Sequence, residues 1–223
     1  MFDPQKLLEQ VLGGASGSGG KGGLSPDLLK GLAGGAAAGG LASILLGSKS
    51  GKKLAKTALK VGGTAALAGL AYKAYQTWQQ NQSATAAPTS TDPQGTVFLP
   101  TAVAARDDLS LVLLRAMISA AKADGHIDAA EQQKIFTRLD TADLDTEAKA
   151  FVIDEMRKPL NIDAVVADAT SPERAVEIYA ASVLAIEADD PSEQAYLAML
   201  AARLKLDPGL KATVEQETTK ALA

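Results

Sequence analysis

The residues best suited to chemistry are acids gathered in two short stretches, which we call the acidic elbows. The first elbow surrounds Gly125 and the second precedes Pro191. Hard cations such as calcium and magnesium bind carboxylate oxygens, and a chain with no cysteine and one histidine must rely on oxygen ligands. The candidate ligands for a divalent cation, calcium or magnesium, are Asp124, Asp128, Glu131, Asp189, Asp190 and Glu193.

These acids also have a purely structural interpretation. Asp128 with Glu131 fits a helix-capping box, Asp124 fits a turn next to glycine, and the second elbow repeats both patterns. A third hypothesis is a metal-assisted enzyme with His126 as base. No phosphate-binding loop and no nucleophile paired with histidine accompanies the elbows. We therefore predict no catalytic residue and no certain cofactor.

Helices must position these acids, because apolar residues after Pro100 recur at helical spacing and strand-like alternation is absent. Cap and proline signals, such as Ser171-Pro172 and Asp207-Pro208, mark helix starts. The fold class is all-α. Helices are expected at about 102–123, 129–140, 146–158, 162–168, 172–188, 191–205 and 208–221.

The expected core of this helical domain is a set of apolar side chains at these spacings: Leu113, Met117, Ile135, Leu139, Phe151, Ile178, Val183, Leu197 and Leu200. The stretches AAKAD (120–124) and AIEAD (185–189) echo each other ahead of the two elbows. The echo suggests two hairpins on one template, in which the elbows lie close together.

The front part of the chain has another composition. Residues 1–82 hold 17 of the 20 glycines and 9 Lys/Arg against 3 Asp/Glu, whereas residues 101–223 hold 13 against 22. We divide the chain into a flexible tether (1–30, with an amphipathic start at Phe2 to Leu12), a Gly/Ala/Lys-rich membrane-associated segment (31–78), a linker (79–101) and a helical domain (102–223).

Residues 31–48 carry no charge over 18 positions, close to the length of a membrane-spanning helix. Gly31, Gly35 and Gly39 recur every fourth residue, a stripe on which a second helix could pack and form a homo-oligomer. Membrane lipid is thus an expected partner. The alternative is a disordered Gly/Ala linker, which would make the protein a soluble helical scaffold.

A second apolar run, 61–72, is too short to span a membrane alone. It fits either a hairpin with 31–48 or an interfacial helix with Tyr72, Tyr75 and Trp78 at headgroup level. The five lysines between Lys49 and Lys60 favour a cytoplasmic C-terminal domain. The excess of acids after residue 101 argues against nucleic acid as a partner.

The runs AMISAAKADGHIDAAEQQKI (116–135) and ASVLAIEADDPSEQAYLAMLAARLKLD (181–207) resemble the TerB-like domain of tellurite-resistance proteins. The layout of the whole chain is similar to YebE-type bacterial inner-membrane proteins, a family of largely unknown function. The resemblance implies an all-helical domain over about 103–221, a cation site at the acidic elbows and an inner-membrane location.

Together these features predict a non-enzymatic protein anchored in the bacterial inner membrane. Its cytoplasmic helical domain would bind a divalent cation or a protein partner, in an envelope or metal stress response.

Overall fold

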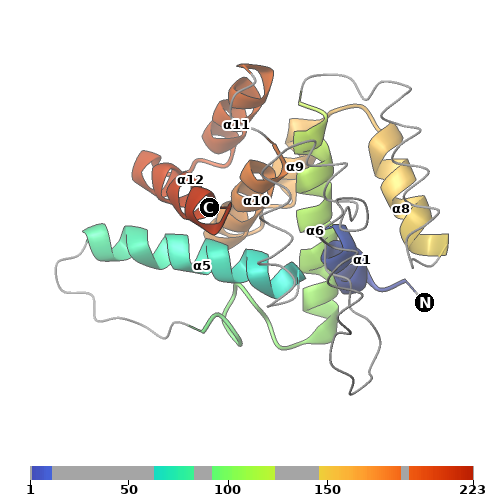
Figure 1. Ribbon diagram of the computed structural model, residues 1–223, viewed down its shortest axis with the longest axis horizontal. Helices are drawn as coiled ribbons and strands as arrows, with labels where there is room; N and C mark the ends of the chain where they lie inside the picture. The colour runs from blue at the N-terminus through green and yellow to red at the C-terminus, as the bar shows by residue number, and fades with distance from the viewer. Residues whose placement is uncertain (1, 12–62, 83–91, 124–145, 187–190, 223) are drawn as a thin grey trace, which may run out of the picture.

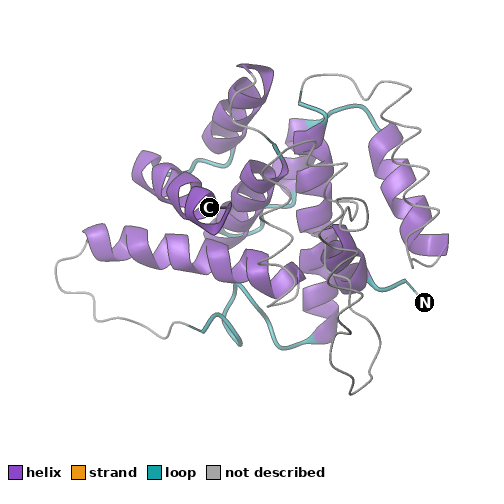
Figure 2. Ribbon diagram, in the orientation of Figure 1, coloured by secondary structure: helices purple, strands orange, loops and turns teal. Residues whose placement is uncertain are grey.

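The fold was analysed in a computed structural model that describes residues 2–11, 63–82, 92–123, 146–186 and 191–222. Eight helices lie within these residues: α1 (Pro4–Val11), α5 (Gly63–Gln82), α6 (Val103–Ala121), α8 (Thr146–Arg157), α9 (Ile162–Ala167), α10 (Pro172–Ala185), α11 (Pro191–Arg203) and α12 (Pro208–Leu222). Figure 2 shows no strand in the described part of the chain, so the all-α prediction is confirmed.

Six of the seven helices expected after residue 101 fall within the described residues, and each is found within about three residues of its expected bounds. The cap signals explain this agreement. Ser171 accepts a hydrogen bond from the Arg174 amide and Pro172 follows at the first helical position, while Asn161 caps α9 by accepting from the Ala164 amide. The helix expected at 129–140 lies outside the described residues.

Helix α10 is the centre of the bundle (Figure 1). Its residues from Ala175 to Ser182 are all buried, and it packs against α5, α6, α11 and α12. A helix that is buried on every face must be enclosed by others. Of the expected core, Leu113, Met117, Ile178, Leu197 and Leu200 are buried, Phe151 and Val183 pack at its edge, and Ile135 and Leu139 lie outside the described residues.

Helix α5 joins this core through a face of small side chains. Leu67, Ala68, Ala71 and Ala74 are buried, and α5 packs chiefly on α12 and α10. Alanine allows the helix axes to approach closely, so α5 supplies a flat surface to both neighbours. Its aromatic residues have protein partners: the rings of Tyr72 and Tyr75 lie 5.4 and 5.6 Å from Phe98.

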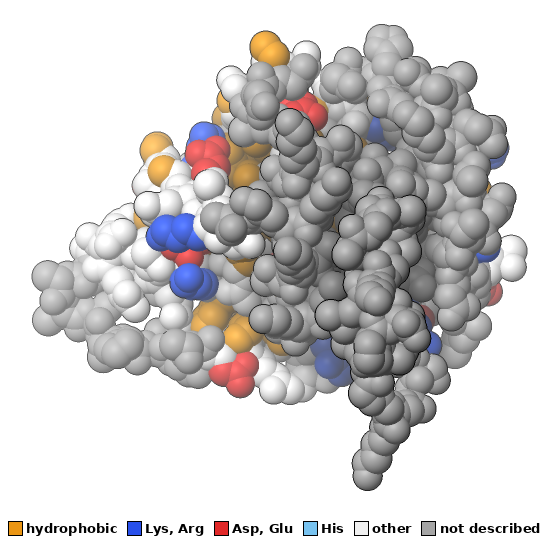
Figure 3. Space-filling view, viewed as in Figure 1, with side chains coloured by type: hydrophobic (Ala, Val, Ile, Leu, Met, Phe, Trp, Pro, Cys, Tyr) orange, Lys and Arg blue, Asp and Glu red, His pale blue; other side chains and the backbone are white. Residues whose placement is uncertain are grey.

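A seam of charges holds α12 on α5. Glu217, 5% exposed, lies 2.7 Å from Lys73 of α5 and 2.7 Å from Lys220 of its own helix. Figure 3 shows basic and acidic side chains gathered over this seam. These hydrogen-bonded ammonium groups lower the pKa of Glu217, so the buried carboxylate stays charged.

Helix α1 covers the junction of α5 and α6. Leu7 and Leu8 are fully buried in the same core as Leu67 and Leu113. Gln5 Nε2 donates to Asp107 Oδ1 at 2.7 Å, and the ring of Phe2 lies 5.7 Å from that of Phe151. The amphipathic start of the chain is therefore part of the bundle.

No described helix is both long enough and apolar enough to cross a membrane. The uncharged run 31–48 and the stripe of Gly31, Gly35 and Gly39 lie outside the described residues.

Candidate functional site

Most of the predicted cation ligands lie outside the described residues. This applies to Asp124, Asp128, Glu131, Asp189 and Asp190, and also to His126. Glu193 is described: it lies half-buried in the first turn of α11, a position where a carboxylate stabilises the helix dipole. Within the described ranges, no group of three or more His, Asp or Glu side chains is arranged to hold a metal ion.

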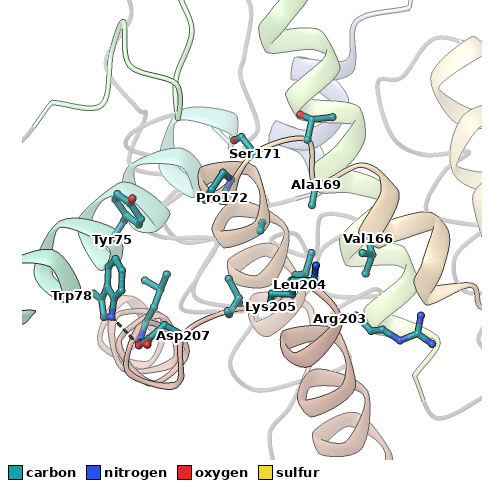
Figure 4. A pocket seen from close by; sticks show the side chains of 14 residues that line it. Tyr75, Trp78, Val166, Ala169, Ser171, Pro172, Arg203, Leu204, Lys205 and Asp207 are labelled. Carbon is teal, nitrogen blue, oxygen red and sulfur yellow. Dashed lines mark hydrogen bonds between the residues drawn. The ribbon is translucent and has the colours of Figure 1, made fainter.

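The described residues instead form a groove of about 570 Å³ where three segments meet: α5, the turn between α9 and α10, and the turn between α11 and α12. Figure 4 shows Tyr75 and Trp78 at one end of this groove and Arg203 at the other. Its walls are mainly apolar, and include Val166, Leu204, Leu206 and Leu210. A cavity of this size is typical of small-molecule sites.

The aromatic end of the groove is built by a hydrogen-bond network. The indole Nε1 of Trp78 donates to Asp207 Oδ1 at 3.0 Å, and the same oxygen accepts from the amides of Gly209 and Leu210 at the start of α12. The indole and the helix amides lower the pKa of Asp207. Asp207 therefore fixes the orientation of Trp78 while capping α12.

At the other end, Arg203 forms an ion pair with Asp163 of α9. The chain then leaves α11 through a Schellman motif, in which the Lys205 amide donates to the Ala202 carbonyl and the Leu206 amide donates to the Ala201 carbonyl. Both hydrogen bonds need a left-handed residue at position 205, and Lys205 has φ 55°.

Glycine is usual at that position because a side chain costs about 1–2 kcal/mol in the left-handed region. Lys205 is the only non-glycine residue with positive φ in the described part of the chain. Its exposed side chain borders the groove (Figure 4). The ammonium group of Lys205 is therefore placed beside the groove although the left-handed backbone at this residue is unfavourable.

A second chemical feature lies in the core rather than in the groove. Glu177 of α10 is 1% exposed, and neither carboxylate oxygen has a hydrogen-bond partner. The nearest cation is Arg174, whose Nε lies 3.7 Å from Glu177 Oε2 and whose Nη2 lies 3.8 Å from Asp108 Oδ2. Burial raises the pKa of Glu177 to about 8, so the group carries a proton at neutral pH.

Neither the groove nor Glu177 was predicted from the sequence. Two sequence features pointed to residues of the groove. Trp78 is the only tryptophan in the chain, and Asp207-Pro208 marks a helix start in the acidic half. Neither signal shows that the two residues meet. Glu177 resembles any polar residue of an exposed helix until the faces of α10 are known to be enclosed.

Comparisons with known proteins give a family but no established activity. The chain is 30% identical over 105 residues to the uncharacterized protein in the ampR 5' region of Yersinia enterocolitica, an alignment that covers 47% of this chain and 76% of that protein. No solved structure matches the chain significantly. Residues 31–218 match the family described as "Protein of unknown function (DUF533)". This match spans most of the sequence, so the chain belongs to the DUF533 family.

Proposed function

We propose that this protein is a non-enzymatic binding module whose groove between α5, α9–α10 and α11–α12 takes a ligand from outside the chain. The observation that carries the proposal is the construction of the groove. Three segments far apart in sequence converge on it, and the orientation of Trp78 is fixed by Asp207 rather than by packing alone. An apolar groove with a few placed polar groups is the usual form of a binding site.

The sole tryptophan makes this proposal testable in the intact protein. Anilinonaphthalene sulfonate, an amphipathic fluorescent probe, should bind the native full-length chain and accept excitation energy from Trp78. Thr170→Phe is a suitable blocking variant, because Thr170 is exposed and borders the groove. Energy transfer should fall in this variant, and the thermal midpoint should stay within a few degrees of the parent. Unchanged transfer, or none in the parent protein, would contradict a binding role for the groove.

We propose further that residues 31–48 hold the module at the bacterial inner membrane, with membrane lipid as a partner and the helical part cytoplasmic. The uncharged run, the lysines that follow it and the YebE-like layout support this location. The Gly31/Gly35/Gly39 stripe supports homo-oligomerisation in the membrane. Carbonate extraction of membranes tests the attachment: the intact protein should stay with the membrane fraction, and its release would refute the anchor.

The second candidate function is cation binding at the acidic elbows, as the resemblance to TerB-like domains implies, within an envelope or metal stress response. Its support is the spacing of Asp124, Asp128 and Glu131 and their repetition at Asp189, Asp190 and Glu193. Calorimetric titration of the full chain with calcium should show heat that Asp124→Ala abolishes. If the parent protein gives no heat with calcium or magnesium, the acids serve as helix caps.

A further inference from the structure

The two ends of the groove differ in chemistry, and this difference identifies a ligand class. We infer that the groove binds a free fatty acid, with its carboxylate at Lys205 and its acyl chain directed along the apolar walls toward Trp78. This inference rests on the proposed binding function and adds the nature of the ligand.

Charge selects the headgroup. Arg203 is already paired with Asp163, whereas Lys205 has no ion-pair partner among the described residues. An ammonium group beside an apolar wall attracts an anion more strongly than one surrounded by water, because the wall excludes solvent from one side. We therefore expect the ligand to place one negatively charged headgroup next to Lys205.

The aromatic end disfavours a second negative group. Asp207 lies there, hydrogen-bonded to the Trp78 indole and to the amides of α12. Those bonds lower its pKa, so its carboxylate remains charged and would repel a ligand carboxylate placed nearby. A ligand with one anionic end and one apolar end satisfies both halves of the groove, and a dicarboxylate does not.

The walls favour a flexible chain. Leu204, Leu206 and Leu210 line the groove with branched aliphatic side chains. Burial of methylene groups against such surface stabilises a complex in proportion to the area removed from water. A volume of about 570 Å³ suits one acyl chain with its headgroup.

The backbone supports the same conclusion independently of charge. The Schellman motif at the end of α11 would be satisfied by glycine, yet residue 205 is lysine at φ 55°. Residues in unfavourable backbone regions are common at ligand sites, where the side chain is needed in that place. At Lys205, the side chain would be needed to bind the carboxylate of the ligand in the groove.

The test is a titration of the full-length protein with three probes that share one chain: dodecanoate and dodecyltrimethylammonium below their micelle concentrations, and dodecanol below its solubility limit. The emission of Trp78 reports occupancy, since no other tryptophan is present. Dodecanoate should bind about tenfold more tightly than dodecanol, because the alcohol carries no charge and cannot form an ion pair with the Lys205 ammonium. The cationic probe should bind more weakly than dodecanol.

Variants at position 205 separate the headgroup contact from the fold. Lys205→Gly should weaken dodecanoate about tenfold, leave dodecanol unchanged and raise the thermal midpoint, because glycine suits φ 55°. Lys205→Arg should retain dodecanoate binding. Lys6→Gln, an exposed lysine of α1 away from the groove, is the matched control and should bind as the parent does.

The outcomes are distinguishable from a failure of the proposed function. Equal affinity for dodecanoate and dodecanol, or dodecanoate binding that Lys205→Gly does not change, overturns the fatty-acid inference while leaving a binding groove in place. If neither these probes nor anilinonaphthalene sulfonate binds, both proposals are refuted.

Discussion

Glu9 and Gly63 touch through their backbones although residues 10–62 separate them in the chain. A Cβ atom on Gly63 would lie 2.8 Å from both the Cα and the amide nitrogen of Glu9. Real Cβ contacts are not this short, so only glycine allows α1 and the start of α5 to approach so closely. The contact brings α1 and the start of α5 together at one point on the bundle.

Gly63→Ala should therefore displace α1. We expect a loss of about 1–3 kcal/mol in the free energy of unfolding, as is typical of overpacking, measured by urea denaturation. Leu7 and Leu8 would lose their buried position, so amide exchange in residues 4–11 should rise. Gly69→Ala is the matched control within α5: its nearest atom would be Pro93 Cγ at 3.9 Å, and the higher helix propensity of alanine should stabilise it. Equal effects of the two substitutions would disprove the contact.

The same contact predicts membrane topology. Because α1 packs on α5 and α6, these three helices must lie on the same side of any membrane to which the protein is attached. The chain has no cysteine, so single cysteines at the exposed positions Lys6 and Lys220 can be labelled separately. An impermeant maleimide applied to spheroplasts should react with both or with neither. Labelling of one alone would show that α1 does not share a compartment with α12.

Glu177 predicts a pH-dependent stability. Its pKa is raised from 4.5 to about 8 by burial, with Arg174 opposing and Glu173 adding to the shift. Between these two pH values the folded protein holds a proton that the unfolded chain releases, so stability falls as pH rises through this window and levels off above it. The decrease should be on the order of a few kcal/mol.

Urea unfolding at several pH values checks this expectation. Glu177→Gln, which cannot ionise, should flatten the decrease and be more stable than the parent protein above pH 8. Asp154→Asn, at an exposed position of α8, should leave the pH profile unchanged. A parent profile without a decrease in this window would mean that Glu177 is not buried as described.

Trp78→Phe keeps a ring at the end of the groove but removes the indole N–H. The bond to Asp207 at 3.0 Å is then lost, so we expect α12 to be held less firmly on α5. The pKa of Asp207 should move up toward its ordinary value, because the indole is the largest cause of its lowering. An NMR pH titration of the Asp207 carboxyl measures this directly, and an unchanged pKa would count against the hydrogen bond.

The helices after residue 101 could be predicted from sequence because their ends carry local signals. Ser171 and Asp207 cap helices by hydrogen bonds within three residues, which needs no knowledge of the tertiary fold. The buried positions Leu113, Ile178 and Leu200 follow from helical spacing in the same way.

The packing partners of helix α5 could not be predicted from the sequence. Ala68, Ala71 and Ala74 form a small-residue face, and that pattern suits close packing in a membrane as well as in a soluble core. The composition of α5 indicates that another helix packs closely on its alanine face, but only the fold shows that the helices on this face are α10 and α12. The groove depends on the same long-range packing, and the six acids of the elbows stay a prediction.

The docking of α1 also bears on the order of folding. A helix of eight residues is too short to be stable in isolation, so α1 depends on the surface that α5 and α6 present to it. The contact between Glu9 and Gly63 closes a long stretch of chain, and such contacts form late because their entropy cost precedes their gain. Helix α1 is thus expected to be the last element to join the bundle and the first to leave it.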